Sequence, residues 1–465
     1  MSQVLDSGLQ AFRDAFGGRV ITAEDPEYNT ARSVWNGDID RYPAVVARCA
    51  DASDATAAIG FARTSGLEIS VRGGGHNFSG AAVADGALMI DLSLLRHVVV
   101  DPVARRVRCG GGTTGADLDA ATQEHGLAVT MGTISHTGIA GLSLGGGFGW
   151  LTNLMGLSCD NLISAEVALA DGRVVRAAED SHPDLYWALR GGGGNFGVVT
   201  EFEFQLQPVG PLVHFALFFW ELDRRADALR VARDALQGLP RDAGGLLAAG
   251  LAAPPEPFVP EQYHFAPGCA VIVAGFGSAE DHAALLTPIR AGLTPAFEFV
   301  TQLPYTALQQ TLDASAPWGI HAYEKGLEID EMPNGLIDTL VEYLPKKQSP
   351  LSFLPIFPLG GAYTDVAEDA TAFGGSRTAR WFVNVGATSP DPAVLAHDRV
   401  WVRELWQALS PYASNTGGYV NFMAEYESDR VRTSYGPTKY ERLSKIKTSY
   451  DPDNVFHLNP NILPG

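Results

Sequence analysis

Short apolar runs alternate with helical patterns along the first part of the chain. Runs of strand-forming residues bounded by glycine or polar positions predict β-strands, and apolar residues spaced three and four apart predict amphipathic helices. Strands are expected at residues 67–71, 87–92, 98–100, 106–109 and 198–206, and helices at 54–64 and 115–124. Asp171 and Gly172 separate two further apolar runs, which predicts a hairpin with a tight turn.

The pattern changes after the segment PVGP at 208–211. Long strand-like runs at 213–220 and 269–276 are each followed by an amphipathic helix, at 224–236 and 278–291. Because this region also lacks glycine clusters, we predict a separate α+β domain over residues 210–414. From residue 435 the chain becomes polar again, and we predict a turn-rich ending.

Composition narrows the class of protein. A chain of 465 residues exceeds one ordinary core, and 46% hydrophobic with 18% charged residues describes a folded globular protein. Its net charge of −20 repels phosphate backbones and anionic lipids, so we expect neither nucleic acid nor a membrane as a partner. Residues 1–17 lack the apolar core of a secretory signal, and no run approaches the ~20 apolar residues of a membrane helix. We therefore expect a cytoplasmic protein.

The cysteines carry no recognisable chemistry. They are scattered, with no CxxC pair, which fits neither a zinc site nor a disulfide framework. They are Cys49, Cys109, Cys159 and Cys269. We expect buried, idle thiols and no metal site.

Glycine is concentrated in clusters in the first half of the chain, at 73–75, 110–112, 145–147 and 191–194. Repeated clusters suggest several loops lining one extended ligand, because glycine lets backbone approach a ligand closely. The segment GGGTTG at 110–115 matches the nicotinamide-binding fingerprint G-x-G-x-x-G, but Ser135 stands where its acidic partner belongs. A nicotinamide-dependent dehydrogenase is therefore a weak alternative.

The segment VRGGGHNFSG at 71–80 is more specific. Three glycines after a strand expose backbone N–H groups that suit a pyrophosphate, and Arg72 offers a positive charge beside them or serves as a surface residue. His76 follows directly, where the chain can approach a cofactor. The longer loop at 132–149 combines glycines and hydroxyls with apolar residues, which indicates an ordered path along a ligand rather than a linker.

These motifs together resemble a known family. RGGGHN at 72–77, GIAGLSLGGGFG at 138–149, DN at 160–161 and WALRGGGGNFGVVT at 187–200 occur in that order. They resemble the FAD-binding domain of the vanillyl-alcohol oxidase (p-cresol methylhydroxylase) superfamily. The ending, with YVN at 419–421, YDPDNVF at 450–456 and NPNI at 459–462, is similar to the berberine-bridge-enzyme branch, in particular to its bacterial 6-hydroxy-D-nicotine oxidase-like members.

The resemblance implies an α+β fold with a two-part FAD-binding domain of the p-cresol methylhydroxylase type and an inserted substrate domain containing an antiparallel sheet. The first part spans 1–209, the substrate domain 210–414, and the segment 415–465 returns to the FAD-binding domain. It further implies that His76 bonds the flavin 8α-methyl group. The other implied cofactor-binding residues are Trp35, Arg72, Gly73, Gly74, Gly75, Asn77, Gly132, Thr133, Thr137, Gly138, Gly141, Leu142, Gly145, Gly149, Gly197, Val199, Asn421, Asn459 and Asn461.

Four of these assignments, those of Trp35, Asn421, Asn459 and Asn461, keep an alternative. Trp35 is equally typical of a core aromatic, and the asparagines near the C-terminus are equally typical of Asx turns. Many relatives form a second flavin link through a cysteine in the second loop, where this chain has Ile134. Because isoleucine forms no thioether, we predict a single covalent link.

The implied chemistry is oxidation of a small molecule. Hydride goes to flavin N5 while a base takes a proton, and the resemblance assigns the base to Tyr419, although a phenol needs a lowered pKa for that role. The segment 351–359 contains no carboxylate of the kind an amine site needs. Phe353 and Phe357 there face either the flavin or the core. A neutral aromatic or apolar substrate is the prediction.

Other functions stay open at this point. A carbohydrate oxidase or an amine oxidase of the nicotine-oxidase type are alternative enzymes, and a non-catalytic flavin-binding protein is the alternative outside enzymes. The expected partners are a small-molecule substrate and dioxygen or another electron acceptor, with a homodimer as the expected assembly.

Overall fold

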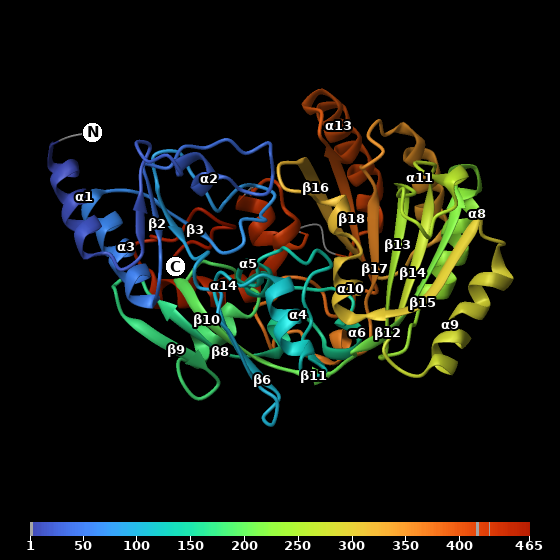
Figure 1. The fold of residues 1–465 in the computed structure, drawn as a ribbon, viewed down its shortest axis with the longest axis horizontal. Helices are drawn as coiled ribbons and strands as arrows, with labels where there is room; N and C mark the ends of the chain where they lie inside the picture. Colours follow the sequence, from blue (N-terminus) through green and yellow to red (C-terminus); the bar gives the residue numbers. More distant parts are fainter. Residues whose placement is uncertain (1–2, 415–417, 427) are drawn as a thin grey trace.

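The computed structural model describes residues 3–414, 418–426 and 428–465. In Figure 1 the N-terminal elements occupy one side of the molecule and a large sheet with its helices the other, and the C-terminal segment returns to the N-terminal side. Val431, Leu443 and Ile462 of that segment are buried in the same core as Val107 and Phe202. The predicted boundaries at 209/210 and 414/415 stay predictions, and residues 415–417 beside the second lie outside the described residues.

The first sheet carries the glycine-rich loop that follows its edge strand. It has the order β1 (Arg19–Ile21), β2 (Val45–Arg48), β4 (Leu88–Asp91), β3 (Ile69–Arg72). Strand β4 is parallel to both β2 and β3. Helix α3 (Ala52–Ser65) covers this sheet; Asp51 caps its start by accepting from the Ser53 and Asp54 N–H groups, and Gly66 ends it with a φ of 67°. Helix α1 (Gln3–Ala15) packs on α3.

The second sheet is antiparallel and five-stranded. Its order is β5 (Val98–Asp101), β6 (Arg106–Gly110), β10 (Val198–Gln205), β8 (Leu162–Ala168), β9 (Val174–Ala178). Alternation in β10 buries Phe202 and Phe204 completely and leaves Glu201 and Glu203 partly exposed. Helices α4 (Gly115–Gln123), α5 (Ile139–Gly145) and α7 (Pro183–Leu189) and the short pair β7 (Leu127–Ala128) and β11 (Gln207–Pro208) complete this part.

The third sheet is antiparallel and seven-stranded. Its order is β15 (Phe297–Pro304), β12 (Leu212–Glu221), β14 (Pro267–Gly275), β13 (Ala243–Ala252), β17 (Leu354–Pro358), β18 (Trp381–Ser389), β16 (His321–Ile329). Its outer face packs against helices α8 (Arg225–Leu236), α9 (Ala279–Gly292), α11 (Asn334–Tyr343) and α13 (Pro392–Leu409). In Figure 1, α8, α9 and α11 lie beyond the sheet, away from the N-terminal elements.

Alternation along each strand decides which residues of this sheet face the N-terminal part. In β12, Ala216, Phe218 and Trp220 belong to the core under the helices. Phe215 and Phe219 point the other way, into a core that also contains Phe148 and Tyr419. The inner face of the seven-stranded sheet is therefore the surface that meets the glycine-rich loops.

The strands and helices predicted from periodicity are present, with bounds shifted by a few residues. The turn-rich ending predicted from residue 435 is wrong up to residue 450, because helix α14 (Ser428–Tyr450) occupies that part, and it is confirmed for residues 451–465, which contain turns and bends and no helix. Gly436, with a φ of 67°, and Pro437 interrupt this helix. Most residues of the helix are polar, so the spacing of the buried Leu443 and Ile446 does not stand out in the sequence. Within the described residues, no helix is both long and apolar enough to cross a membrane.

Candidate active site

A cavity of about 370 Å³ lies between the glycine-rich loops and the inner face of the seven-stranded sheet. Segments far apart in the sequence form its wall. They come from the regions 69–82, 132–148, 193–199, 312–324, 353–357, 384–388, 419–426 and 456–460. The cavity therefore joins the first sheet, the helix α5 loop, the inserted sheet and the C-terminal segment in one site.

Two glycine loops meet at the centre of this wall by direct backbone contact. A Cβ atom on Gly74 would lie 2.3 Å from the nitrogen of Gly138, and one on Gly138 would lie 2.3 Å from the nitrogen of Gly74. Neither residue can be replaced without separating the loops. By contrast, a Cβ on Gly141 or Gly194, both in the wall, would meet no protein atom within 4 Å. The cradle is closed behind and open toward the cavity, as a bound ligand requires.

His76 lies in the wall at the end of the first loop. Its ring stacks on Trp35 with centroids 4.7 Å apart, which also fixes the position of Trp35 in the site. Its Nε2 hydrogen-bonds to Nδ1 of His136 at 2.7 Å. Burial and the neighbouring His136 lower the pKa of His76 to about 3, so the imidazole is neutral at physiological pH. Its Nδ1 has no hydrogen-bond partner among the residues that the structure describes.

The second loop presents Ile134 to the cavity at the position where many relatives were expected to carry a linking cysteine. All four cysteines are free and buried, as predicted, and none lies in the wall formed by the described residues. Burial is the main reason that the pKa values of the Cys49, Cys109 and Cys159 thiols lie above their usual value. The chain thus offers a nucleophilic imidazole in the wall but no thiolate.

Tyr419 and Asn421 close the cavity beside helix α5. The Tyr419 hydroxyl oxygen accepts hydrogen bonds from the Gly147 N–H and from Asn421 Nδ2, each at 2.7 Å. Asn421 Nδ2 also donates to the Leu142 carbonyl. A Cβ on Gly145 would lie 2.1 Å from Asn421 Oδ1, so Gly145 makes room for that amide.

The acidity of Tyr419 depends on two opposing effects. Burial raises its pKa above the ordinary value, whereas the donors from Gly147 and Asn421 lower it and are the smaller effect. The phenol is therefore protonated at neutral pH. Because its oxygen already accepts two hydrogen bonds, its own O–H is free to point elsewhere in the cavity.

The part of the cavity wall beside Tyr419 is mainly apolar. Phe353 and Phe357 from around β17 lie in the wall, and the Phe357 ring meets that of Phe148 edge-on with centroids 5.0 Å apart. Phe422 and Pro355 extend this surface. The polar pair Glu324 on β16 and Asn384 on β18, which no sequence motif indicates, also lies in the wall.

Most of the predicted cofactor-binding residues lie in the wall of this single cavity. They are Trp35, Gly73, Gly74, Gly75, His76, Asn77, Gly132, Thr133, Thr137, Gly138, Gly141, Leu142, Gly197, Val199, Asn421 and Asn459. Asn77 donates to the Tyr426 hydroxyl, and Asn459 donates to the carbonyls of Gly194 and Phe456.

Four predicted residues lie outside the wall. Arg72 donates to the Ala31 carbonyl and lies 4.0 Å from the buried Asp91, and its assignment to the cofactor stays a prediction. Gly145 accommodates Asn421, and a Cβ on Gly149 would lie 2.0 Å from the Met131 carbonyl oxygen. Asn461 lies outside the wall with a buried Oδ1 that has no partner within the described structure.

The fingerprint-like cluster at 110–112 also lies outside the wall. A Cβ on Gly110 or Gly112 would lie about 2 Å from the carbonyl oxygen of Leu95 or Leu92, respectively. These glycines allow close packing of the backbone between the first two sheets. The cluster has no structural basis as a nicotinamide site.

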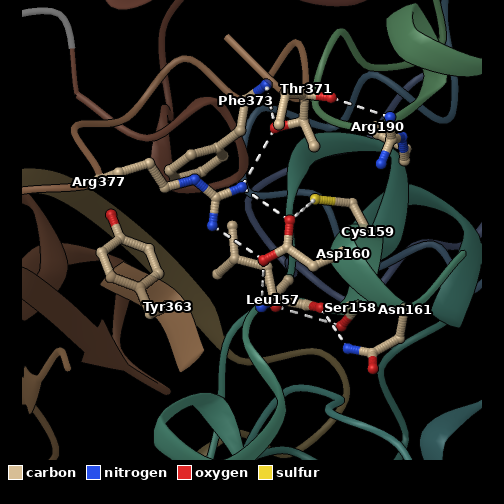
Figure 2. Close-up of polar contacts among 12 residues, drawn as sticks. Leu157, Ser158, Cys159, Asp160, Asn161, Arg190, Tyr363, Thr371, Phe373 and Arg377 are labelled. Atoms are coloured by element: carbon tan, nitrogen blue, oxygen red, sulfur yellow. Dashed lines mark hydrogen bonds and ion pairs between the residues drawn. The ribbon is translucent and has the colours of Figure 1, made fainter. Parts of the chain in front are cut away.

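The DN motif lies outside the cavity wall and is held by an ion pair (Figure 2). Asp160 forms two hydrogen bonds with the Arg377 guanidinium, at 2.7 and 2.9 Å, and both side chains are almost completely buried. The same turn donates from Ser158 N to the Gly147 carbonyl and from Cys159 N to the Gly146 carbonyl. Asp160 thus connects the inserted domain to the glycine backbone that holds Tyr419.

Comparisons with known proteins agree with this geometry. Residues 43–178 match the FAD binding domain family, and residues 418–463 match the family described as berberine and berberine like. (R)-6-hydroxynicotine oxidase from Paenarthrobacter nicotinovorans is 31% identical, with 96% of this chain and 97% of that protein covered. The structure of 6-hydroxy-D-nicotine oxidase from Arthrobacter nicotinovorans matches with a TM-score of 0.84 at 28% identity, covering 97% of this chain and 99% of that one.

A third likeness concerns the fold alone. Glucooligosaccharide oxidase from Acremonium strictum, which has a 6-S-cysteinyl, 8α-N1-histidyl FAD, matches with a TM-score of 0.83 at 24% identity over 99% of both chains. Fold and site together define a flavin-binding oxidoreductase of the p-cresol methylhydroxylase type. The chain belongs to the family of FAD-linked oxidoreductases that carry a berberine-like C-terminal segment, which confirms the resemblance found in the sequence.

Proposed function

We propose that this FAD-dependent oxidoreductase holds its flavin through one covalent bond, from His76 to the 8α-methyl carbon, and oxidises a small, mainly apolar molecule. The observation that carries the proposal is the neutral His76 imidazole in the wall of the glycine cradle, with Nδ1 unpartnered among the described residues. A neutral imidazole has a free lone pair that can form a bond to carbon, whereas a protonated one has none. Glucooligosaccharide oxidase provides a precedent for a histidyl link in this fold.

The residues around His76 suit the same role. Stacking on Trp35 and the hydrogen bond to His136 fix the ring plane, so that one nitrogen faces the cradle. Ile134 and the absence of cysteine from the described wall support a single link. A covalently attached FAD supplies a two-electron acceptor, and the protein contributes binding and orientation.

Tyr419 is proposed as the group that exchanges a proton with the substrate. Its oxygen is fixed by donors from Gly147 and Asn421, so its own O–H is free to meet a ligand in the cavity. Its pKa lies above the usual range because the ring is buried, which keeps the phenol protonated until a bound substrate or the cofactor changes its surroundings. The electron acceptor that closes the cycle is proposed to be dioxygen or another small oxidant.

The apolar end of the cavity supports a ring-containing or otherwise apolar substrate. Phe353, Phe357, Phe422 and Phe148 supply aromatic surface there, which favours an apolar body over a heavily hydroxylated one. A carbohydrate oxidase is the second candidate, because glucooligosaccharide oxidase from Sarocladium strictum is 26% identical over 93% of this chain.

The covalent link is tested by denaturing the purified protein in acid and looking for yellow fluorescence on the polypeptide band. We expect fluorescence for the wild type and for His264→Ala, a control histidine that hydrogen-bonds to the Val259 carbonyl away from the cavity. His76→Ala should lose it while still binding free FAD. A wild-type flavin that separates from the polypeptide, or a fluorescent His76→Ala band, would overturn the proposed bond.

A further inference from the structure

One carboxyl group faces the cavity from the inner side of the seven-stranded sheet. Glu324 lies on β16, and its odd-numbered neighbours Tyr323 and Leu327 pack in the core under the outer helices. Alternation therefore turns Glu324 inward, where it lines the cavity and is only 1% exposed. Among the described wall residues it is the sole carboxylic acid, and neither lysine nor arginine accompanies it.

A neighbouring amide fixes this carboxyl. Strands β16 and β18 pair so that Gly326 is opposite Asn384, which places the Asn384 side chain beside Glu324. Asn384 Nδ2 donates to Glu324 Oε2 at 2.6 Å. The remaining oxygens, Glu324 Oε1 and Asn384 Oδ1, are buried and have no hydrogen-bond partner within the described structure. Two unpartnered polar atoms thus belong to one hydrogen-bonded pair of side chains in the cavity wall.

Such atoms are costly in a finished core, since an unsatisfied buried polar group destabilises a protein by about 1–3 kcal/mol. Glu328 on the same strand and the same face shows the structural alternative. It is equally buried, but its Oε2 accepts from the Ser376 N–H, and it lies outside the wall. The contrast indicates that the Glu324 pair is left open for a ligand.

Burial also determines the charge state of Glu324. It raises the pKa of Glu324 well above the usual range, and the hydrogen bond from Asn384 offsets only part of this effect. A protonated Glu324 whose Oε2 accepts from Asn384 presents its O–H through Oε1. The pair then offers one donor and one acceptor to the cavity.

We propose that Glu324 and Asn384 are the polar anchor of the substrate cavity and bind a hydroxyl group of the substrate. A hydroxyl group is neutral and both donates and accepts a hydrogen bond, and the rest of the substrate is an apolar molecule that contains a ring. This inference rests on the proposed function and names the substrate class of that site. Glu324 Oε1 and Asn384 Oδ1 hold the hydroxyl, and the phenylalanines pack against the ring. The pair is a specificity determinant contributed by β18, which lies next to β17, and by β16, which lies next to β18.

The test uses ligands that cannot be oxidised, bound to the flavin-loaded enzyme without oxygen. Phenol, anisole and fluorobenzene have similar rings, but only phenol both donates and accepts a hydrogen bond. Binding is followed by the shift in the flavin absorption spectrum. We expect phenol to bind the wild type about tenfold more tightly than the other two, as one additional buried hydrogen bond predicts.

The variants separate the anchor from general effects. Glu324→Leu should bind phenol no better than fluorobenzene, whereas Glu324→Gln keeps a donor at the same place and should retain most of the preference. Glu328→Gln is the matched control and should retain it fully. In infrared difference spectra, phenol should shift the C=O band of a protonated carboxyl group in the wild type, and this band should be missing from both Glu324 variants.

Two results would overturn the inference: equal binding of phenol and fluorobenzene to the wild type, or an undiminished preference for phenol in Glu324→Leu. Melting temperatures check that the variants fold, and Glu324→Gln preserves the shape of the side chain if leucine is not tolerated. The covalent flavin test of His76 is independent of phenol binding. If phenol shows no preferred binding but the polypeptide band is fluorescent, the anchor proposal has failed. If phenol binds as expected but the flavin separates from the polypeptide, the covalent bond proposal has failed.

Discussion

Replacing Arg377 by methionine removes one half of the ion pair that connects the inserted domain to the DN turn (Figure 2). Arg377 is 3% exposed and Asp160 7% exposed at their side chains, so the remaining carboxylate would have no access to bulk water. Burial alone disfavours the charged form of Arg377 and lowers its pKa. The hydrogen bonds to Asp160 and the negative charge of Asp160 outweigh burial, so the pKa of Arg377 is raised. Breaking such a pair from one side costs about 3–5 kcal/mol.

Urea unfolding with the flavin bound measures this magnitude directly. We expect Arg377→Met to lower the free energy of unfolding by about 3–5 kcal/mol, because it leaves a buried charge unpaired. Arg290→Met is the control, because Arg290 and Glu298 form an ion pair of similar length, 3.0 Å, whose side chains are 44% and 38% exposed. Its loss should cost about 0–1 kcal/mol.

A double variant tests the reason for the loss. Asp160→Asn combined with Arg377→Met removes the unpaired charge but keeps an oxygen that can accept from the Leu157 N–H, as Asp160 does now. It should be more stable than Arg377→Met alone. If the single variant loses no more than Arg290→Met, or if the double variant is the less stable of the two, the buried charge is not the source of the effect and the reasoning is refuted.

Three further predictions follow from single contacts. Gly74→Ala should prevent flavin loading, because its Cβ would lie 2.3 Å from the Gly138 nitrogen. Gly60→Ala in α3, whose Cβ would meet open space, should instead stabilise the protein by up to about 1 kcal/mol. Flavin content and melting temperature measure the two effects. Tyr419→Phe should slow anaerobic flavin reduction by about 100-fold and leave the absorption spectrum intact; an unchanged rate excludes Tyr419 as the proton-exchanging group. Burial raises the pKa of Asp119 to about 7 in the folded protein. The same carboxyl group loses its proton near pH 4 in the unfolded chain, so the free energy of unfolding falls as the pH rises from about 4 to about 7. Unfolding free energies of Asp119→Asn should depend less on pH across that window, by up to about 4 kcal/mol, and an identical pH profile would contradict the assignment.

The cofactor end of the site could be predicted from the sequence because backbone contacts govern it. Where two loops touch at Gly74 and Gly138, only glycine fits, so the requirement appears as an unbroken motif. His76 directly follows the glycines of that motif in the chain, and its ring stacks on Trp35. Local sequence was sufficient here, since each constraint acts within a few residues.

Glycine clusters also occur where close packing, rather than a ligand, requires glycine. Gly110 and Gly112 pass the carbonyls of Leu95 and Leu92 as closely as the loop glycines pass each other, so their spacing imitates a nucleotide fingerprint. Arg72 is likewise held by Asp91 and the Ala31 carbonyl, which are partners that no local pattern identifies. Composition of a loop does not reveal what lies opposite it.

The substrate end could not be predicted in this way because pairing between distant strands creates it. The segment around β17 has no carboxylate, and that observation argued for a neutral substrate. The carboxyl group comes instead from Glu324, brought into the same wall by the pairing of β16 with β18. The absence of acid from one strand therefore says little about the charge of the site. The preference for a neutral ligand depends instead on Glu324 being protonated, because it is buried and no lysine or arginine lies among the described wall residues. Such a site recognises a hydroxyl group by its position in the cavity as well as by its ability to donate and accept a hydrogen bond.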